Sequence, residues 1–316
     1  MDKELIFKIY INIASITAIL LNFFLLLLAV FKSPSSLKTY SILVINFAIT
    51  NLTASICQDF TQLRLINVND SIMHVAYGMC YRIGPKLCYT LYTIMLHSFC
   101  HTELCTLLSF IFSYYTLKKG APEWNRFLKI LILFYIPSFV LLVTSLLASQ
   151  PIGNAYNELI TQYPHYSIDA KQITGKIMFS STLSGFSRIM FTVFPVPILF
   201  GVICIKRKIM SFLKSQVHHM SEETKKMHEQ FLKALTFNAI LPVLFVINGI
   251  VFSIIKQVDY TEPLLECSNS FILSLVSIIS PLFYLVYIVP YRKALIEYIM
   301  MRPMIKSISK QTQESH

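Results

Sequence analysis

The stretch Ser280–Arg292 reads SPLFYLVYIVPYR, and it places a proline inside an apolar run that a Pro-Tyr-Arg triplet closes. It belongs to the last of seven long stretches that carry almost no charged residue. These stretches are Ile9–Phe31, Thr39–Gln58, Leu87–Leu117, Ile130–Asn157, Ile189–Ile205, Ala234–Ile255 and Cys267–Tyr291. A membrane-spanning helix needs about 17–25 mostly apolar residues, so each stretch is long enough to cross once. The sequence predicts an all-α membrane protein built as a seven-transmembrane helix bundle.

The composition agrees with a membrane protein of one domain. The chain has 316 residues, of which 55% are hydrophobic and 14% charged, whereas soluble domains carry about 25% charged residues. Continuous apolar runs exclude the alternating pattern of membrane-barrel strands. Only a short tail, MDKELIFK, precedes the first stretch, so we expect no cleavable signal peptide and no extracellular domain before it, and no internal repeat is apparent. We expect one bundle domain over residues 1–300 and a tail over residues 301–316.

The distribution of basic residues predicts the orientation of the seven spans. If the N-terminus lies outside, the cytoplasmic segments carry 18 Lys and Arg against 6 Asp and Glu, and the outer segments carry 9 of each kind. Lys and Arg are enriched in cytoplasmic loops, so we expect an outer N-terminus and a cytoplasmic tail. The net charge of +11 then indicates attraction to anionic lipid of the inner leaflet, and not a nucleic-acid partner.

Polar residues and prolines interrupt several of the apolar stretches. The first stretch contains Asn22, the second Asn46 and Asn51, the sixth Pro242, and the seventh Pro281 with Tyr284. Polar groups in a membrane tend to face the bundle interior. A proline inside a helix removes one backbone hydrogen bond and bends the helix, and neighbouring side chains can satisfy the freed carbonyl. We expect these residues to pack and gate the bundle; the alternative is that they only hold helices together.

A short amphipathic helix is expected after the seventh span. Pro290 marks the end of the span, and Arg292 and Lys293 follow at the level of the lipid headgroups. Leu295 and Tyr298 would then face the lipid.

The third stretch contains the only acidic residue of any predicted span, within LHSFCHTELC at residues 96–105. His101 and Glu103 predict a polar core with a buried hydrogen-bond network around the carboxyl group; a polar floor of a ligand pocket is the alternative. His97, His101 and Cys105 share one helix face at i, i+4 and i+8, as zinc ligands would. One helix does not close a tetrahedral site, so we expect no metal and no other cofactor.

Three segments carry a resemblance to a receptor family. They are SPSSLKTYSILVINFAITNL (33–52), CYRIGPKLCYTLYTIMLH (80–97) and SPLFYLVYIVPYRKAL (280–295). The order of polar residues resembles the rhodopsin-like receptors, and the segments more closely resemble the nematode serpentine chemoreceptors of class delta. The chain departs from the wider receptor pattern, with Asn51 in place of an acid, Ser280 in place of an asparagine and Ser113 in place of an arginine.

The resemblance implies a chemosensory G-protein-coupled receptor in the plasma membrane, with a role in olfaction and a place in a sensory cilium. It implies a pocket for a small-molecule ligand that opens outward between helices three, five, six and seven. The candidates for ligand binding are Tyr89, Tyr92, Met95 and His97. The implied cytoplasmic partner is a heterotrimeric G protein, and the residues that would face it are Tyr114, Tyr115, Lys226, Phe231 and Arg292. Helix six is expected to begin at a Ser221 cap in the cytoplasm; a solvated loop with a surface-lying helix is the alternative.

Seven cysteines leave at least one thiol unpaired. Residues 154–188 contain no cysteine, so the disulfide from helix three to the second outer loop of rhodopsin-like receptors cannot form. We expect a bond between Cys80 and Cys88, or between one of these two and Cys267. The triplet Asn69-Asp70-Ser71 is a glycosylation sequon in the first outer loop.

Enzyme motifs such as G-x-S-x-G, H-E-x-x-H and the P-loop are missing from the sequence, and we expect no catalytic residues. The alternative to a receptor is a membrane channel or transporter. That class predicts inverted repeats or several charged residues within the spans, and one intramembrane acid without a repeat argues against it.

Overall fold

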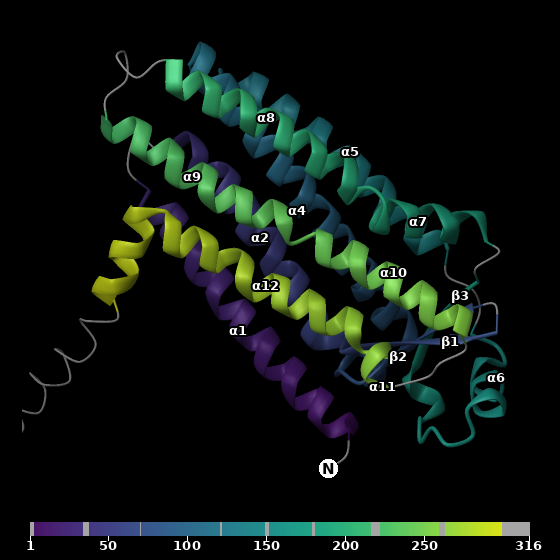
Figure 1. Ribbon diagram of the computed structural model, residues 1–316. Helices are drawn as coiled ribbons and strands as arrows, with labels where there is room; N and C mark the ends of the chain where they lie inside the picture. The colour runs from purple at the N-terminus through teal and green to yellow at the C-terminus, as the bar shows by residue number, and fades with distance from the viewer. Residues whose placement is uncertain are drawn as a thin grey trace, which may run out of the picture.

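The computed structural model describes residues 3–33, 38–69, 71–120, 122–148, 152–178, 181–215, 222–258 and 263–298. Among these residues, five helices are long and apolar enough to cross a membrane. They are α1 (Lys3–Phe31), α2 (Lys38–Thr61), α4 (Pro85–Lys119), α5 (Trp124–Leu147) and α12 (Ser268–Tyr287). Figure 1 shows them running along a common axis, and α1 packs against both α2 and α12.

The fifth and sixth predicted spans are each divided into two helices that follow one another along the same axis (Figure 1). They are α7 (Thr182–Thr192) with α8 (Pro195–Ser215), and α9 (Glu222–Ile240) with α10 (Val243–Val258). Proline has no N–H to donate into the preceding turn, and Pro195 and Pro242 stand at the two interruptions. The interruption at Pro242 lies where the sequence predicts a bend. Pro281, in contrast, lies inside the continuous helix α12.

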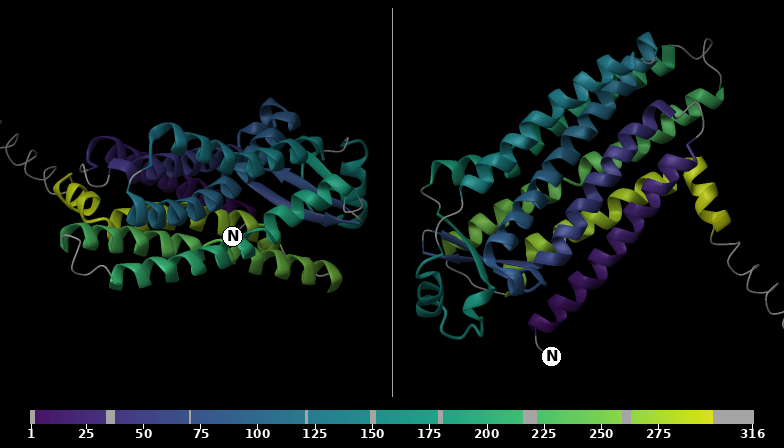
Figure 2. Two further views of the ribbon diagram at one scale, coloured as in Figure 1. Left: turned by 90° about the horizontal axis from the view of Figure 1, so that it is seen from above. Right: turned by 180° about the vertical axis from the view of Figure 1, so that it is seen from behind.

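A three-stranded antiparallel sheet covers one end of the bundle, and the sequence analysis did not predict it. Strands β1 (Leu63–Val68) and β2 (Ser71–Ala76) form a hairpin, and β3 (Ile173–Met178) pairs with β2. Asn69 in the two-residue connection has a φ of 50°, a backbone conformation that asparagine tolerates in hairpin turns. Figures 1 and 2 show the N-terminus, α6 (Ala155–Gln162) and α11 (Pro263–Glu266) at this end, which we call the sheet end.

The opposite end of the bundle, which we call the tail end, carries a further helix over residues 289–298. Helix α12 ends at Tyr287, and Ile288 has an extended backbone with φ −84° and ψ 105°. The chain therefore turns away from the bundle (Figure 2). This is the short helix that the sequence predicts after the seventh span, with Arg292 and Lys293 exposed.

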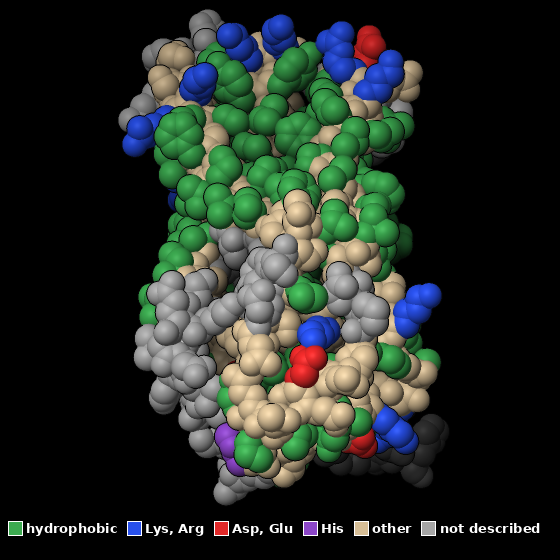
Figure 3. Space-filling model, turned by 90° about the vertical axis from the view of Figure 1, so that its right-hand side faces the viewer, with side chains coloured by type: hydrophobic (Ala, Val, Ile, Leu, Met, Phe, Trp, Pro, Cys, Tyr) green, Lys and Arg blue, Asp and Glu red, His purple; other side chains and the backbone are tan. Residues whose placement is uncertain are grey.

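The outer faces of the bundle are apolar. Large hydrophobic side chains such as Leu20, Ile132 and Leu133 are 59–63% exposed on α1 and α5. Figure 3 shows a band of hydrophobic side chains along the molecule, with lysine and arginine side chains gathered at one end of it. A soluble protein does not leave apolar faces of this size open to water, so the faces match a lipid environment.

Candidate functional site

A small cavity lies beneath the strands at the sheet end, and we call it the sheet pocket. Its volume is about 90 Å³. It is lined by Leu65, Ile72, His74, Tyr89, Tyr92, Leu96, Ser145, Ala148, Ile177, Ser184 and Ser187. The sheet supplies one wall, and α4, α5 and α7 supply the others. The described lining contains no Asp, Glu, Lys or Arg, which favours an uncharged occupant.

His74 on strand β2 is the most informative residue of the sheet pocket. Its side chain is 1% exposed, and its Nδ1 atom has no hydrogen-bond partner among the described residues. The imidazole stacks on Tyr89 with ring centroids 5.7 Å apart and meets Tyr92 edge-on at 4.6 Å. Burial lowers the pKa of His74 from 6.5 to about 3, so the imidazole is neutral at physiological pH. A buried polar atom without a partner is costly, and a bound ligand would remove that cost.

Tyr89 joins the walls of the sheet pocket. Its hydroxyl donates a hydrogen bond to the backbone carbonyl of Ser145 on α5, at 2.7 Å. The Oγ atoms of Ser145 and Ser187 lie 3.2 Å apart and form a hydrogen bond between α5 and α7. The pocket geometry is therefore connected to the position of α7, the half of the broken helix five at the sheet end.

Glycine at position 175 allows strand β3 to approach the pocket closely. Gly175 pairs with His74 across the sheet. A Cβ atom at this position would lie 2.7 Å from Cδ2 of Tyr89 and 2.9 Å from Nδ1 of His74. Contacts this short are not tolerated between packed atoms, so only glycine lets the sheet close over the two rings.

The buried imidazole predicts an acid-sensitive sheet end. The folded protein keeps His74 neutral down to a pKa of about 3, whereas the unfolded chain takes up a proton below pH 6.5. The contribution to stability is thus present above pH 6.5 and is lost progressively as the pH falls from 6.5 toward 3. His74→Phe should flatten this part of the curve of unfolding temperature against pH. His165→Phe, at an exposed histidine, serves as the control, and equal curves for both variants would contradict the prediction.

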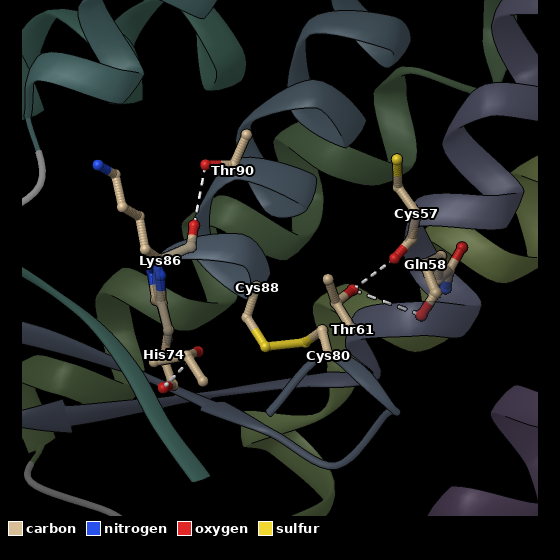
Figure 4. Close-up of a disulfide and its surroundings, with 9 residues drawn as sticks. Cys57, Gln58, Thr61, His74, Cys80, Lys86, Cys88 and Thr90 are labelled. Carbon is tan, nitrogen blue, oxygen red and sulfur yellow. Dashed lines mark hydrogen bonds between the residues drawn. A yellow bond between two sulfur atoms is a disulfide. The ribbon is translucent and has the colours of Figure 1, made fainter. Parts of the chain in front are cut away.

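A disulfide between Cys80 and Cys88 holds the start of α4 in place (Figure 4). It links α3 (Cys80–Ile83) to the first turns of α4, where Thr90 Oγ1 also donates to the carbonyl of Lys86. Of the three pairings that the sequence leaves open, the structure contains this one. Cys267 is a free buried thiol, and burial raises its pKa to about 12.

A buried ion pair closes the sheet end beside the pocket. The Nε atom of Arg64 on β1 donates to Oε2 of Glu266 on α11 at 2.6 Å, and the two side chains are 8% and 9% exposed. The hydroxyl of Tyr166 donates to Oε1 of Glu266 at 2.8 Å, and the guanidinium lies 4.5 Å from the centre of the Tyr166 ring. Arg64 also donates to the hydroxyl of Tyr77 at 3.1 Å. These four side chains join the β1–β2 hairpin to α11, the segment before α12.

The structure brings two of the four predicted ligand residues into the sheet pocket. Tyr89 and Tyr92 line it, whereas Met95 is buried in a hydrophobic cluster below it. His97 faces α5, where Nδ1 lies 2.8 Å from the carbonyl oxygen of Ser138 and Nε2 lies 3.0 Å from the hydroxyl of Tyr135. None of the described lining residues comes from helices six or seven, because the sheet pocket lies on the α5 side of α4.

The polar core of α4 forms around His101, and not around Glu103 as the sequence analysis expects. The imidazole of His101 lies 3.2 Å from Oγ of Ser138 and 3.3 Å from both Nδ2 of Asn46 and Sγ of Cys105. Glu103 is buried at 7% exposure, and no hydrogen bond joins it to another described residue. The two side chains differ by two positions on a helix and therefore point to nearly opposite faces.

Asn22 satisfies the backbone group that Pro281 leaves open. A proline at 281 cannot donate to the carbonyl of residue 277, four positions earlier. The Nδ2 atom of Asn22 on α1 donates to the carbonyl of Ser277 at 3.1 Å and to that of Ala18 at 2.8 Å. Asn22 is fully buried, so the contact replaces the missing helix bond where water is excluded.

Two further predicted gating residues lie in the core with different roles. The amide of Asn51 donates only to the carbonyl of Phe47 in its own helix, at 3.3 Å. The ring of Tyr284 packs on Phe47 with centroids 4.7 Å apart and lies 6.5 Å from Phe231.

The tail end contradicts one predicted partner contact. Phe231 on α9 is 1% exposed and packs against Tyr40 at 4.9 Å, so it belongs to the core and does not face a partner. Its apolar helix face packs inside the bundle. Lys226 and Arg292 are exposed, and Tyr114 and Tyr115 are half-buried. The predicted cap Ser221 lies outside the described residues.

Aromatic and imidazole side chains join α2 and α9 near the tail end. The hydroxyl of Tyr40 lies 3.2 Å from Nδ1 of His228.

Ser113 on α4, at the position where the receptor resemblance leads us to expect an arginine, is fully buried.

Comparison with known proteins agrees with this architecture. The family described as Serpentine type 7TM GPCR chemoreceptor Srd matches residues 7–297. The chain is 32% identical over 286 residues to serpentine receptor class delta-18 of Caenorhabditis elegans. The aligned region covers 86% of this chain and 82% of that protein. It is 28% identical to serpentine receptor class delta-3 of the same organism, over 96% of this chain and 90% of that protein. The resemblance noted in the sequence is thereby confirmed, and the chain belongs to the Srd family of seven-transmembrane serpentine chemoreceptors.

Proposed function

We propose that this receptor binds a small uncharged molecule in the sheet pocket and activates a heterotrimeric G protein at the tail end. The observation that carries the proposal is the Nδ1 atom of His74, which has no hydrogen-bond partner among the described residues and is buried in a pocket whose described lining carries no charge. The cavity volume of about 90 Å³ suits a small, compact occupant.

The proposed orientation places the sheet end outside the cell and the tail end in the cytoplasm. It rests on the excess of Lys and Arg in the segments assigned to the cytoplasm, which is 18 against 6 acidic residues. The exposed Lys226 and Arg292 and the half-buried Tyr114 and Tyr115 then form the surface offered to the G protein. The plasma membrane of a sensory neuron is the proposed location.

Asn69 is expected to carry a glycan in this orientation. It is exposed in the turn between β1 and β2, at the sheet end. Asn69→Gln should increase electrophoretic mobility to that of the enzymatically deglycosylated wild-type protein. Unchanged mobility on both treatments would contradict an outer location for this turn.

The ligand proposal is tested by comparing two substitutions at the end of α5. Ala148→Val adds two methyl groups to a pocket-lining residue that is 1% exposed. Leu147→Phe also enlarges the side chain at the neighbouring residue, which is 65% exposed and does not line the pocket. Cells that express each variant are challenged with a panel of small uncharged odorants, and G-protein activation and surface delivery are both measured.

We expect Ala148→Val to raise the concentration for half-maximal response by tenfold or more, an effect of about 1.4 kcal/mol, and Leu147→Phe to leave it unchanged. Both variants should reach the surface as the wild type does. Equal responses of the two variants would exclude the sheet pocket as the ligand site. A ligand-gated current without G-protein activation would instead favour a channel.

A further inference from the structure

A second and larger cavity lies between the inner half of helix five and helix six, and we call it the α8–α9 cleft. Its volume is about 660 Å³. Residues Leu199, Val202 and Ile203 of α8 form one wall, and Ala239 and Ile240 of α9 with Val243 of α10 form the other. Ile203 is 41% exposed and Ile240 is 52% exposed, so the cleft opens sideways onto the apolar outer face of the bundle.

The apolar part of the α8–α9 cleft spans about two thirds of one leaflet of a bilayer. The lining on α8 runs from Leu199 to Ser211, and its part from Leu199 to Lys206, where the charged side chains begin, is about 10 Å long at about 1.5 Å of rise per residue. The hydrocarbon core of a bilayer is about 30 Å thick, so one acyl chain extends through about half of that distance. The cleft can therefore hold an acyl chain aligned with α8.

Basic side chains stand at the polar end of the α8–α9 cleft. Lys206 and Arg207 line it, together with the hydroxyl groups of Ser211 and Thr236. Neither basic residue forms an ion pair within the described part of the chain. Long basic side chains keep their methylene groups on apolar surface and extend the charge toward the headgroups. The arrangement thus combines an apolar slot with two cations that have no counterion among the described residues.

We propose that the α8–α9 cleft is a binding site for an anionic phospholipid, with an acyl chain between α8 and α9 and the headgroup at Lys206 and Arg207. Charge complementarity selects this occupant, since a headgroup with net negative charge balances the two cations better than a zwitterionic headgroup, whose phosphate is offset by its own cation. The leaflet that supplies it follows from the orientation proposed above, and anionic lipid is concentrated on the cytoplasmic side. Because Val243 follows the interruption at Pro242, a lipid in the cleft also contacts the break between α9 and α10 in helix six.

The site is tested with the full chain in nanodiscs that contain phosphatidylcholine and phosphatidylserine in equal amounts. Nanodiscs present both faces of the protein to both lipids, so an error in the proposed orientation would not cause the test to fail. Lipid that stays bound after transfer to detergent is counted by native mass spectrometry, and its affinity is measured by titration with phosphatidylserine. The wild-type protein should retain phosphatidylserine in preference to phosphatidylcholine.

Two matched pairs of variants separate the headgroup contact from the acyl slot. K206Q/R207Q should weaken phosphatidylserine binding about 30-fold, whereas K118Q/K119Q, at exposed lysines of α4 outside the cleft, should change it less than about threefold. Ile240→Trp should fill the slot and abolish retention. Ile247→Trp, which is also at a residue 52% exposed but outside the cleft, should not.

Three results would overturn the proposal. They are equal binding by K206Q/R207Q and the wild type, equal retention by Ile240→Trp and Ile247→Trp, and retention of phosphatidylcholine as strongly as phosphatidylserine. Each variant is checked for a single symmetric peak in size-exclusion chromatography, so that loss of lipid is measured on folded protein. Ile247→Trp, which adds the same side chain to the same apolar face, shows whether the added bulk alone disturbs the bundle.

Discussion

Replacing Glu266 by glutamine is expected to destabilise the receptor by about 3–5 kcal/mol, because it leaves the buried Arg64 charge without compensation. The two side chains are 8% and 9% exposed, and two tyrosine hydroxyls complete the group. The loss of stability should appear as a lower unfolding temperature in detergent. It should also appear as faster labelling of the buried thiol of Cys267, which adjoins Glu266.

The control for this prediction is the ion pair between Lys176 and Glu158, whose side chains are 17% and 34% exposed. Glu158→Gln should cost less than about 1 kcal/mol, as accessible pairs do. The double variant Arg64→Met with Glu266→Leu should recover most of the stability lost in Glu266→Gln, since it removes both charges. A double variant as unstable as Glu266→Gln would show that the ion pair itself stabilises the sheet end.

Asn22→Leu is expected to destabilise the wild-type protein by about 1–3 kcal/mol, the cost of a buried carbonyl without a partner. The same substitution should cost at least about 1 kcal/mol less in the background of Pro281→Ala. Alanine at 281 restores an N–H that donates to the carbonyl of Ser277, so the contact from Asn22 to that carbonyl at 3.1 Å is then redundant. The measurement is a double-mutant cycle of unfolding free energies in detergent.

Asn51→Leu supplies the matched control for this cycle. Asn51 is also a buried asparagine within a span, but it donates only to Phe47 of its own helix. Its cost should be the same with proline or alanine at position 281. Equal coupling of Asn22 and Asn51 to Pro281 would mean that Asn22 does not act through the freed carbonyl.

The helices of this fold are more predictable from sequence than the sheet that covers them. Seven apolar stretches and the prolines give the spans and the interruption in helix six, because lipid leaves the backbone few alternatives to a helix. The hairpin carries a local signal, since LRLINV and SIMHVA flank the turn residues Asn69-Asp70. Strand β3 carries none of comparable strength, since its partner β2 lies about 100 residues earlier in the chain.

The candidate site shows where helix patterns cease to be informative. Tyr89 and Tyr92 could be nominated from their place on α4, whereas His74 reaches the pocket from a strand that was not predicted, and Ser187 from a helix about 100 residues further along the chain. The resemblance implies a partner-facing Phe231, yet this side chain packs on Tyr40 in the core. Periodicity identifies an apolar face, but it does not distinguish lipid, a partner or another helix as its neighbour.

The central claim, that the chain crosses the membrane seven times, depends on the two broken helices. An epitope inserted between Ser215 and Glu222, in the connection from α8 to α9, tests it most directly. With seven crossings this epitope stains only after permeabilisation, while an N-terminal epitope on the same protein stains in intact cells. If α7–α8 and α9–α10 do not cross, the inserted epitope stains in intact cells together with the N-terminal one, and the seven-helix account is wrong.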